Sequence, residues 1–466
     1  MTFRAAPLLL ALAAAGCSAV RSARDAQEAA VQKSRDGRAV PSVAMQDVGR
    51  LSSLPSCVAF ALTNRPSVVS ARLSVDDARL QLKQIAAGAP VVSATPWNAL
   101  GLSASAGWSE TSGELHARDL DGHTDGSPSA ALSLEALLYD FGRNAAEARA
   151  QAERVIAAEQ ALIDEGYAVF KDVADATFAC REKALLLDAA ETNELSFLSR
   201  LQRVESQRSE GEAKSLDVLR ARLDHARARE DLVAASNALR TAFSEFRHAL
   251  GIPAAETYAD ERLRRALPRE RLRFTAEDPV WLARTNAPSM RIARARLRAA
   301  SADVDRAVAD LYPTLTASAS LSWADPLWVL SWGGRAAQSL FQGFRKTAAV
   351  DLATVALRQA EAEVDAVEQD LVRSLEQALA TRGDALEAER AARDSLAAAL
   401  ENLEVVLGQS KIGEADRVEL ADAVNAVAEA RAGIASAVCR EQKAQAALFV
   451  LTGTQPVYES PSKEEK

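Results

Sequence analysis

One long passage occurs twice in this chain, and this duplication constrains the fold more than any other feature. Residues 138–251 align without a gap on residues 340–453, at a constant offset of 202. Within them, Gly211-Glu212-Ala213 recurs as Gly413-Glu414-Ala415. A repeat that keeps its register over more than a hundred residues predicts two copies of one structural unit.

The repeated passage has the composition and spacing of long helices. Residues 144–205 contain no proline and one glycine, among mostly strong helix formers. Val155, Leu162 and Val169 fall seven residues apart. A seven-residue repeat predicts long helices that supercoil around their neighbours. An ordinary long antiparallel coiled coil also satisfies this segment when it is taken alone.

Glycines mark where these helices turn and end. Each long helix is predicted to turn back near Gly211 or Gly413, and each return helix to end at Gly251 or Gly453. Glycine suits a helix end because it adopts positive φ without a steric penalty. Each copy is therefore predicted to be a helical hairpin, with its tip at residues 209–214 or 411–416.

A second repeated passage precedes each long helix. Residues 63–67 recur as residues 285–289, now at an offset of 222. Each is followed by an apolar periodicity that predicts a helix, over 68–86 or 290–309. The change of offset from 222 to 202 places about 20 extra residues in the first copy, between residues 100 and 138.

Strict alternation of apolar and small polar residues follows these helices. It covers residues 100–108, 130–136 and 315–323, which is the pattern of half-buried strands. These strands have about the length of transmembrane barrel strands. Four strands per chain cannot close a barrel, and open edges promote aggregation, so the chain is predicted to oligomerise. A pair of soluble hairpins is the alternative.

Tryptophans support the membrane interpretation of these strands. Five of the six tryptophans lie in the two hairpin zones, which favours an interfacial aromatic girdle. They are Trp97, Trp108, Trp323, Trp328 and Trp332.

The N-terminus has the pattern of a bacterial export signal. Arg4 precedes an apolar run over residues 5–15, which ends in Gly16-Cys17. A charged start, an apolar run and small residues at the end predict a secretory signal. The ending resembles a lipobox, which implies cleavage before Cys17 and acylation of that cysteine, palmitate included. The residue after it, Ser18, implies sorting to the outer membrane. A plain secretory signal with an incidental cysteine is the alternative.

Composition excludes several classes of function. The net charge of −9 argues against a nucleic-acid partner. No nucleophile constellation, phosphate loop or metal-ligand cluster is present, so we predict no catalysis, no cofactor and no metal site. The loop at residues 116–126 lacks the distal Glu of a calcium loop and is predicted to be solvated.

Cys57, Cys180 and Cys439 are predicted to be small packing residues. No stretch after the N-terminus is apolar enough for a transmembrane helix.

The order of these features resembles the TolC-like outer-membrane efflux factor family, from about Leu54 to Gly453. The most specific marks are the strand-to-helix junctions. Residues 138–143 read Leu-Tyr-Asp-Phe-Gly-Arg and residues 340–345 read Leu-Phe-Gln-Gly-Phe-Arg, similar to the family's Leu-Phe-Asp-Gly-Gly-Arg. The junction residues that carry the resemblance are Tyr139, Asp140, Gly142, Phe341 and Gly343.

This resemblance implies a mostly α fold with a small β part. Three chains would form a 12-stranded transmembrane β-barrel in the outer membrane, and their helical hairpins would form an α-barrel that projects into the periplasm. The implied partners are a periplasmic adaptor protein, an inner-membrane pump and outer-membrane lipid. The implied function is the channel component of a tripartite efflux or type I secretion system, a passive duct. The rival is a lipid-anchored periplasmic coiled-coil scaffold without channel activity.

The resemblance also implies roles for residues near the hairpin tips. Residues that contact the adaptor are expected to be Arg208, Ser209, Gly211, Lys411, Ile412 and Gly413. Carboxylates six and nine residues beyond a tip glycine are expected to line the narrow periplasmic aperture; here they are Glu419, Asp422 and Asp217. Carboxylates crowded around a three-fold axis repel one another and attract cations. A solvated helix face is the alternative for these side chains.

These features divide the chain as follows. We expect a signal peptide at 1–16, an extended arm with the lipidated Cys17 at 17–53, a first repeat at 54–252, a linker at 253–275, a second repeat at 276–454 and a polar tail at 455–466.

Overall fold

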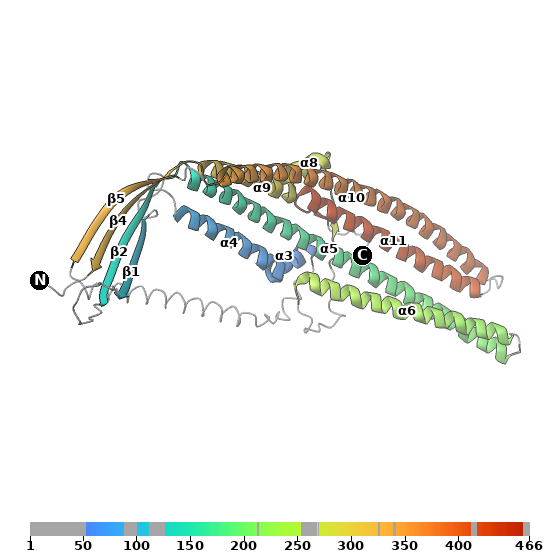
Figure 1. Cartoon of the computed structure of the whole chain (residues 1–466). Helices are drawn as coiled ribbons and strands as arrows, with labels where there is room; N and C mark the ends of the chain where they lie inside the picture. The colour runs from blue at the N-terminus through green and yellow to red at the C-terminus, as the bar shows by residue number, and fades with distance from the viewer. Residues whose placement is uncertain are drawn as a thin grey trace.

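The chain folds into an elongated molecule with strands at one end and helical tips at the other (Figure 1). The computed structural model describes residues 53–87, 100–110, 126–211, 214–252, 268, 270–324, 327–338, 342–411 and 417–459. The predicted signal peptide, Cys17 and loop 116–125 lie outside these residues.

Two long helical hairpins form most of the molecule. Helices α5 (Arg143–Ser209) and α10 (Arg345–Lys411) each have 67 residues, which is about 100 Å of helix. The return helices α6 (Ser215–Leu250) and α11 (Arg417–Thr452) each have 36 residues. Every boundary of the second hairpin lies 202 residues after its counterpart in the first, so the predicted duplicated hairpins are confirmed.

The predicted glycine positions have the expected backbone. Gly211 has φ 86°, Gly251 has φ 75° and Gly453 has φ 62°. The Gly251 N–H donates to the His248 carbonyl oxygen at 3.0 Å, which closes the last turn of α6. These ends form because a left-handed residue terminates an α-helix and glycine accepts that conformation at little cost.

A kinked pair of shorter helices precedes each hairpin. The pairs are α3 (Leu54–Asn64) with α4 (Pro66–Ala87), and α8 (Pro279–Asn286) with α9 (Pro288–Ala309). A proline disfavours helical backbone at the residue before it, and Arg65 and Ala287 accordingly have ψ of 126° and 128°.

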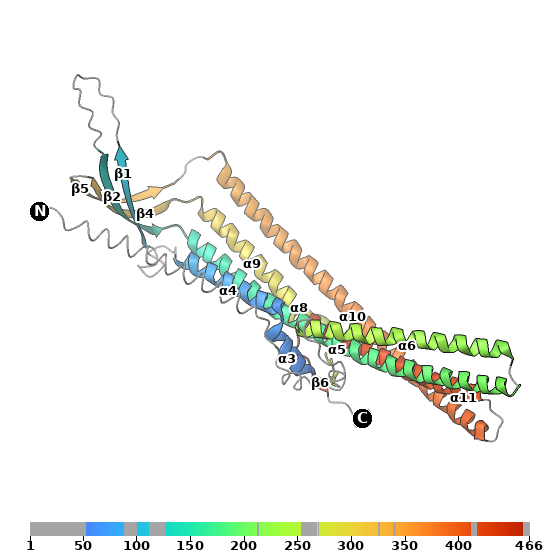
Figure 2. The same ribbon diagram turned by 90° about the horizontal axis from the view of Figure 1, so that it is seen from below.

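The helices lie side by side in a fixed order. Near the strands the order is α4, α5, α9, α10 (Figure 2), and near the tips it is α6, α5, α11, α10 (Figure 1). The helices at the two outer edges therefore belong to different repeats. Among the described helices, none combines the length and the apolar character that crossing a membrane requires.

Four strands form one antiparallel sheet in the order β1-β2-β4-β5. They are β1 (Leu100–Glu110), β2 (Gly126–Tyr139), β4 (Thr314–Ala324) and β5 (Leu327–Ala337). The β2–β4 pairing joins the two repeats. Serine hydroxyls pair across the strands, Ser103 with Ser133 at 2.6 Å and Ser320 with Ser331 at 2.7 Å. Strands β1 and β5 each pair on one side only within the described sheet.

The apolar core lies at mid-length, where α3 and α8 cover the hairpins. Its largest fully buried side chains include Phe178, Phe243 and Phe246. A two-stranded sheet of β3 (Arg271–Leu272) and β6 (Tyr458–Glu459) also packs here.

The three cysteines in the described part of the chain are buried, and none of them forms a disulfide with another described cysteine. Burial raises the pKa of the Cys57 and Cys180 thiols to about 12 and also raises the pKa of Cys439. The interpretation of these cysteines as packing residues is therefore confirmed.

Candidate aperture, docking tips and strand–helix junctions

The first hairpin tip is a short turn that faces solvent. The Ser209 hydroxyl donates to the Ser206 carbonyl oxygen at 2.6 Å, and the Gly211 N–H donates to the Arg208 carbonyl oxygen at 3.1 Å. Arg208, Ser209 and Gly211 are all exposed. These three residues are therefore accessible to a partner protein.

The second tip has the same helical frame. Lys411 is the last residue of α10, whereas Ile412 and Gly413 lie outside the described residues. Since α11 begins at Arg417 as α6 begins at Ser215, the two turns span the same length of chain.

Two predicted aperture carboxylates lie at the start of α11. Glu419 is in its first turn and Asp422 follows three residues later, so both lie on one face of the helix. Both are exposed, and neither has an ion-pair partner within the described part of the chain. A carboxylate in the first turn of a helix is stabilised by the helix dipole. This face is therefore an acidic surface beside the second tip.

Asp217 has a structural role that the sequence did not reveal. It lies in the first turn of α6, and its carboxylate accepts the Lys214 backbone N–H at 3.3 Å. The side chain therefore helps to cap its own helix, in addition to its predicted place near the aperture.

Polar contacts join the two helices of the first hairpin near its tip. The Arg222 guanidinium donates from Nε and Nη2 to Glu205 Oε1, at 3.1 and 2.8 Å. His225 Nε2 lies 2.9 Å from Glu194 Oε1. The positions 202 residues later are all apolar: Leu407, Val424, Leu396 and Val427. Comparison of the two copies could have predicted these contacts, because polar residues of the first copy stand where the second copy has apolar ones.

An apolar groove separates the two hairpins where they diverge towards the tips. Its walls come from α5, α10 and α11. The aliphatic residues that line it are Leu185, Leu400, Leu403, Val424 and Val427.

The strand-to-helix junction is closed by a buried carboxylate. Asp140 Oδ1 accepts the Gly142 N–H at 3.2 Å, and Oδ2 accepts the Asn144 N–H at 2.7 Å. These bonds satisfy amide groups at the start of α5 that lack intrahelical partners. Tyr139 stacks edge-on against Phe141, with ring centroids 4.8 Å apart.

Two consecutive residues at each junction have positive φ. In the first copy they are Phe141 at 53° and Gly142 at 88°; in the second they are Gly343 at 58° and Phe344 at 61°. This backbone is the physical reason for a Gly-Gly pair, and each copy here replaces a different one of the two glycines. Phe341 lies outside the described residues.

Asp140→Ala is expected to lower the free energy of unfolding by about 1–2 kcal/mol, since it removes a helix cap from a buried site. Thermal unfolding of the purified protein measures this. The counterpart in the second copy is Gln342, whose side chain accepts only from Arg345 in the described structure. Gln342→Ala is therefore the control, and an equal loss in both variants contradicts the capping role.

Comparison with known proteins agrees with this architecture. The model of the outer membrane efflux protein family matches residues 59–252 and 280–454, and the chain belongs to this family. It is thus a subunit of an outer-membrane efflux channel, whose helices project into the periplasm. Channels of this family are homotrimers that work with adaptor proteins and inner-membrane pumps in tripartite efflux systems. No curated protein sequence matches the chain.

Solved structures share the fold at low sequence identity. A membrane protein from Pseudomonas aeruginosa is 22% identical, with a TM-score of 0.71 over 86% of this chain and 90% of that one. The Campylobacter jejuni CmeC outer membrane channel is 14% identical, with a TM-score of 0.72 over 86% and 85%. The Neisseria gonorrhoeae MtrE outer membrane channel, in its open state, is 19% identical, with a TM-score of 0.68 over 86% and 89%.

Proposed function

We propose that the trimer is a passive export duct, without catalytic activity, whose periplasmic end is narrowed by Glu419 and Asp422. The observation that carries this proposal is the exposed acidic face at the start of α11, next to the second hairpin tip. Three chains place six such carboxylates around one axis. No described Lys, Arg or His side chain forms an ion pair with them within the chain. Their negative charges therefore act together on solutes that enter the duct.

The electrostatic consequence is selectivity for cations at the aperture. Carboxylates on a narrow ring attract positive ions and repel anions. Asp217 adds a carboxylate from the first hairpin. One of its oxygens already accepts the Lys214 backbone N–H, so this side chain is partly engaged in capping its own helix. Glu419 and Asp422 therefore dominate the proposed aperture.

The exposed tips are the proposed docking site for the adaptor. Arg208, Ser209 and Gly211 present a solvent-facing turn, and Lys411 ends the corresponding helix of the second hairpin. Ile412 and Gly413 complete the proposed contact by their place in the repeat. An adaptor bound at both tips would contact each helical hairpin at its end. Binding could therefore move the hairpins apart and widen the duct.

Two further predictions from the sequence accompany this proposal. Acylation of Cys17 would anchor the mature chain to the outer membrane. The division into a signal peptide, an arm, two repeats, a linker and a tail stays a prediction.

Release of a trapped dye from proteoliposomes tests the passive duct. Trimers inserted without a pump, nucleotide or proton gradient are expected to release a small cationic dye faster than an anionic dye of equal size. Light scattering in detergent verifies the trimer before reconstitution. Trimers that insert but release neither dye favour the scaffold without channel activity.

A further inference from the structure

The two repeats have unequal neighbours within one chain. Helix α5 packs against α9 and α11 of the other repeat, besides its own α4 and α6. Helix α10 packs against α8, α9 and α11 of its own repeat. On α5, one side is covered by α9 and α11 of the other repeat. The corresponding side of α10 has no described helix against it. Helices α4, α6 and α10 consequently form the free edges of the molecule (Figures 1 and 2).

Burial identifies the uncovered side of α10. Ala150 on α5 is 0% exposed, whereas its counterpart Leu352 on α10 is 71% exposed. Glu153 on α5 contacts Arg298 of α9 at 2.8 Å, whereas its counterpart Val355 is exposed. Large aliphatic side chains therefore occupy the positions of α10 that correspond to the α9-facing side of α5.

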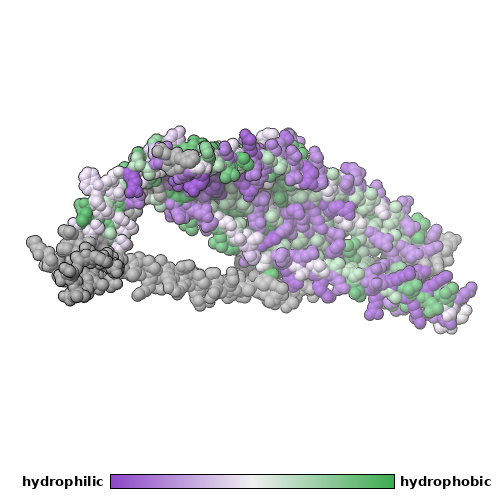
Figure 3. Space-filling view, viewed as in Figure 1, coloured by the Kyte–Doolittle hydropathy of each residue, from purple (hydrophilic) through white to green (hydrophobic). Residues whose placement is uncertain are grey.

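The same comparison identifies the uncovered side of α4. Ala295 on α9 is 0% exposed, whereas its counterpart Leu73 on α4 is 62% exposed. Ala302 on α9 is also buried, and its counterpart Leu80 is exposed. Leu73 and Leu80 lie seven residues apart, so they share one side of α4. The helical surface as a whole is largely hydrophilic with separate hydrophobic patches (Figure 3). Exposed aliphatic residues in a row along a helix mark a contact surface.

Charge distinguishes the uncovered sides from their covered counterparts. Arg149 of α5 pairs with Asp305 of α9, with 3.5 Å between Nη2 and Oδ2. The counterpart of Arg149 is Asp351 on α10, and the counterpart of Asp305 is Lys83 on α4. The two corresponding positions therefore also have opposite charges, but the signs are exchanged. Both Lys83 and Asp351 are exposed, and neither is in an ion pair within the described residues.

We propose that α4 of one copy lies against α10 of the next copy in the register that α9 takes against α5, with Lys83 opposite Asp351 of the adjacent copy. In that register Leu80 lies level with Leu352 and Val355 of the adjacent copy, and the contact covers the aliphatic surface that a single chain leaves exposed. This inference rests on the homotrimer and specifies the chemistry of the contact between its chains.

The reversed charge selects between the two possible pairings. If α4 took the place of α9 on α5, Lys83 would face Arg149. If α9 took the place of α4 on the neighbouring α10, Asp305 would face Asp351. Both arrangements bring like charges together, and like charges in close contact disfavour the wrong partner.

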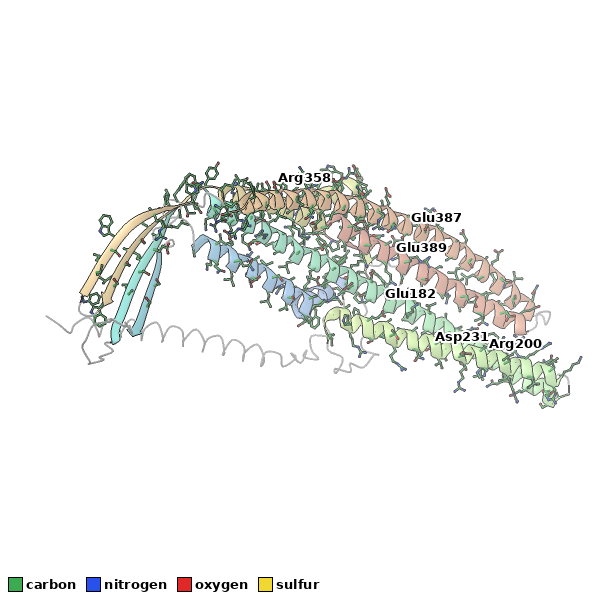
Figure 4. All side chains as sticks on the ribbon, viewed as in Figure 1. Glu182, Arg200, Asp231, Arg358, Glu387 and Glu389 are labelled. Carbon is green, nitrogen blue, oxygen red and sulfur yellow. The ribbon has the colours of Figure 1, made fainter. Side chains whose placement is uncertain are left out.

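The seam within a chain and the seam between chains also differ in composition. The α5–α9 seam has further ion pairs, including Arg154 with Asp303 at 2.6 Å and Arg143 with Asp310 at 3.1 Å. Their counterparts are not oppositely charged pairs. On α10 (Figure 4) Glu387 is exposed, and its ion pair within the described residues is with its helix neighbour Arg390, whereas Glu389 is buried at 8% exposed. Because Leu352 and Val355 stand where α5 has Ala150 and Glu153, the proposed seam between chains is more aliphatic near the strands than the α5–α9 seam.

Thiol cross-linking tests this register. In Lys83→Cys with Asp351→Cys, a short bifunctional maleimide is expected to produce covalent dimers and trimers on a denaturing gel. Each single variant and the wild type are expected to produce neither, because Cys57, Cys180 and Cys439 are buried. Arg149→Cys with Asp305→Cys is the matched control, since its cross-link stays within one chain.

The charge exchange provides a second readout. Lys83→Asp is expected to reduce the fraction of trimer, and adding Asp351→Lys is expected to restore it. Trimers that form no covalent ladder while the control pair cross-links would overturn the register but leave the duct in place. A wild-type protein that is monomeric in detergent would instead contradict the proposed function.

Discussion

Gly453→Ala is expected to destabilise the folded protein by about 2–5 kcal/mol, the sum of left-handed backbone strain and overpacking. Gly453 ends α11 with φ +62°, and an added Cβ would lie 2.6 Å from the Asn286 carbonyl oxygen and 2.9 Å from its carbon. Both are backbone atoms at the α8–α9 kink, so no rotamer change relieves the contact. The Gly453 carbonyl oxygen also accepts the Tyr167 hydroxyl at 2.9 Å, which fixes this point to α5.

Two other glycines separate strain from crowding. Gly211 has φ +86° but no atom within 4 Å of an added Cβ, so Gly211→Ala is expected to cost only about 1–2 kcal/mol. Gly251 has φ +75° and backbone of Arg65 at 3.2 Å, so its variant is expected to lie between the two. Thermal unfolding in detergent gives the order. Equal shifts in all three variants would show that crowding at the kink contributes nothing.

Glu441→Ala is expected to cost about 2–4 kcal/mol, because it removes the acceptor of two buried amide groups. The Glu441 carboxylate accepts the side-chain N–H groups of Gln442, at 2.6 Å, and of Gln445. Their amide oxygens in turn accept the backbone N–H groups of Leu272, at 2.6 Å, and Phe274, at 2.8 Å. All three polar side chains are buried. Glu441 thereby orients the two glutamines that hold the segment between the repeats on α11.

Hydrogen exchange at Leu272 and Phe274 measures this effect directly. Both amides are expected to exchange faster in Glu441→Ala, with a smaller change in Glu441→Gln, which keeps one acceptor oxygen. Glu429→Ala makes the same change at an exposed position of the same helix, where substitutions cost about 0.5 kcal/mol or less. Unchanged exchange in Glu441→Ala would mean that the glutamines hold the segment without the carboxylate.

Duplication explains how much of the fold the sequence predicts. Where both copies agree, each copy checks the other, and the helix ends at Gly251 and Gly453 lie where expected. The strands were predicted because a period of two differs clearly from the helical period. The junctions were located by resemblance, and the two consecutive positive φ values now give the physical reason for glycine there.

The features that sequence analysis missed are those in which the copies differ. Glu441 and Gln445 correspond to Leu239 and Phe243 in the first copy, so the repeat suggests an apolar contact rather than a polar network. The β3–β6 pairing joins short segments from the predicted linker and tail, and two residues per strand are too few for a periodic pattern. The capping role of Asp217 depends on where α6 begins, and helix boundaries are the least predictable feature of a sequence.

Single-channel conductance in a planar bilayer tests the central claim most directly, with the wild type compared with the double variant Glu419→Ala, Asp422→Ala. An acidic aperture at the end of a passive duct predicts small cation-selective steps in the wild type, and larger, less selective steps in the variant. Equal steps in both proteins would keep the duct and remove these two residues from its aperture. A silent bilayer that contains intact trimers would contradict the channel itself.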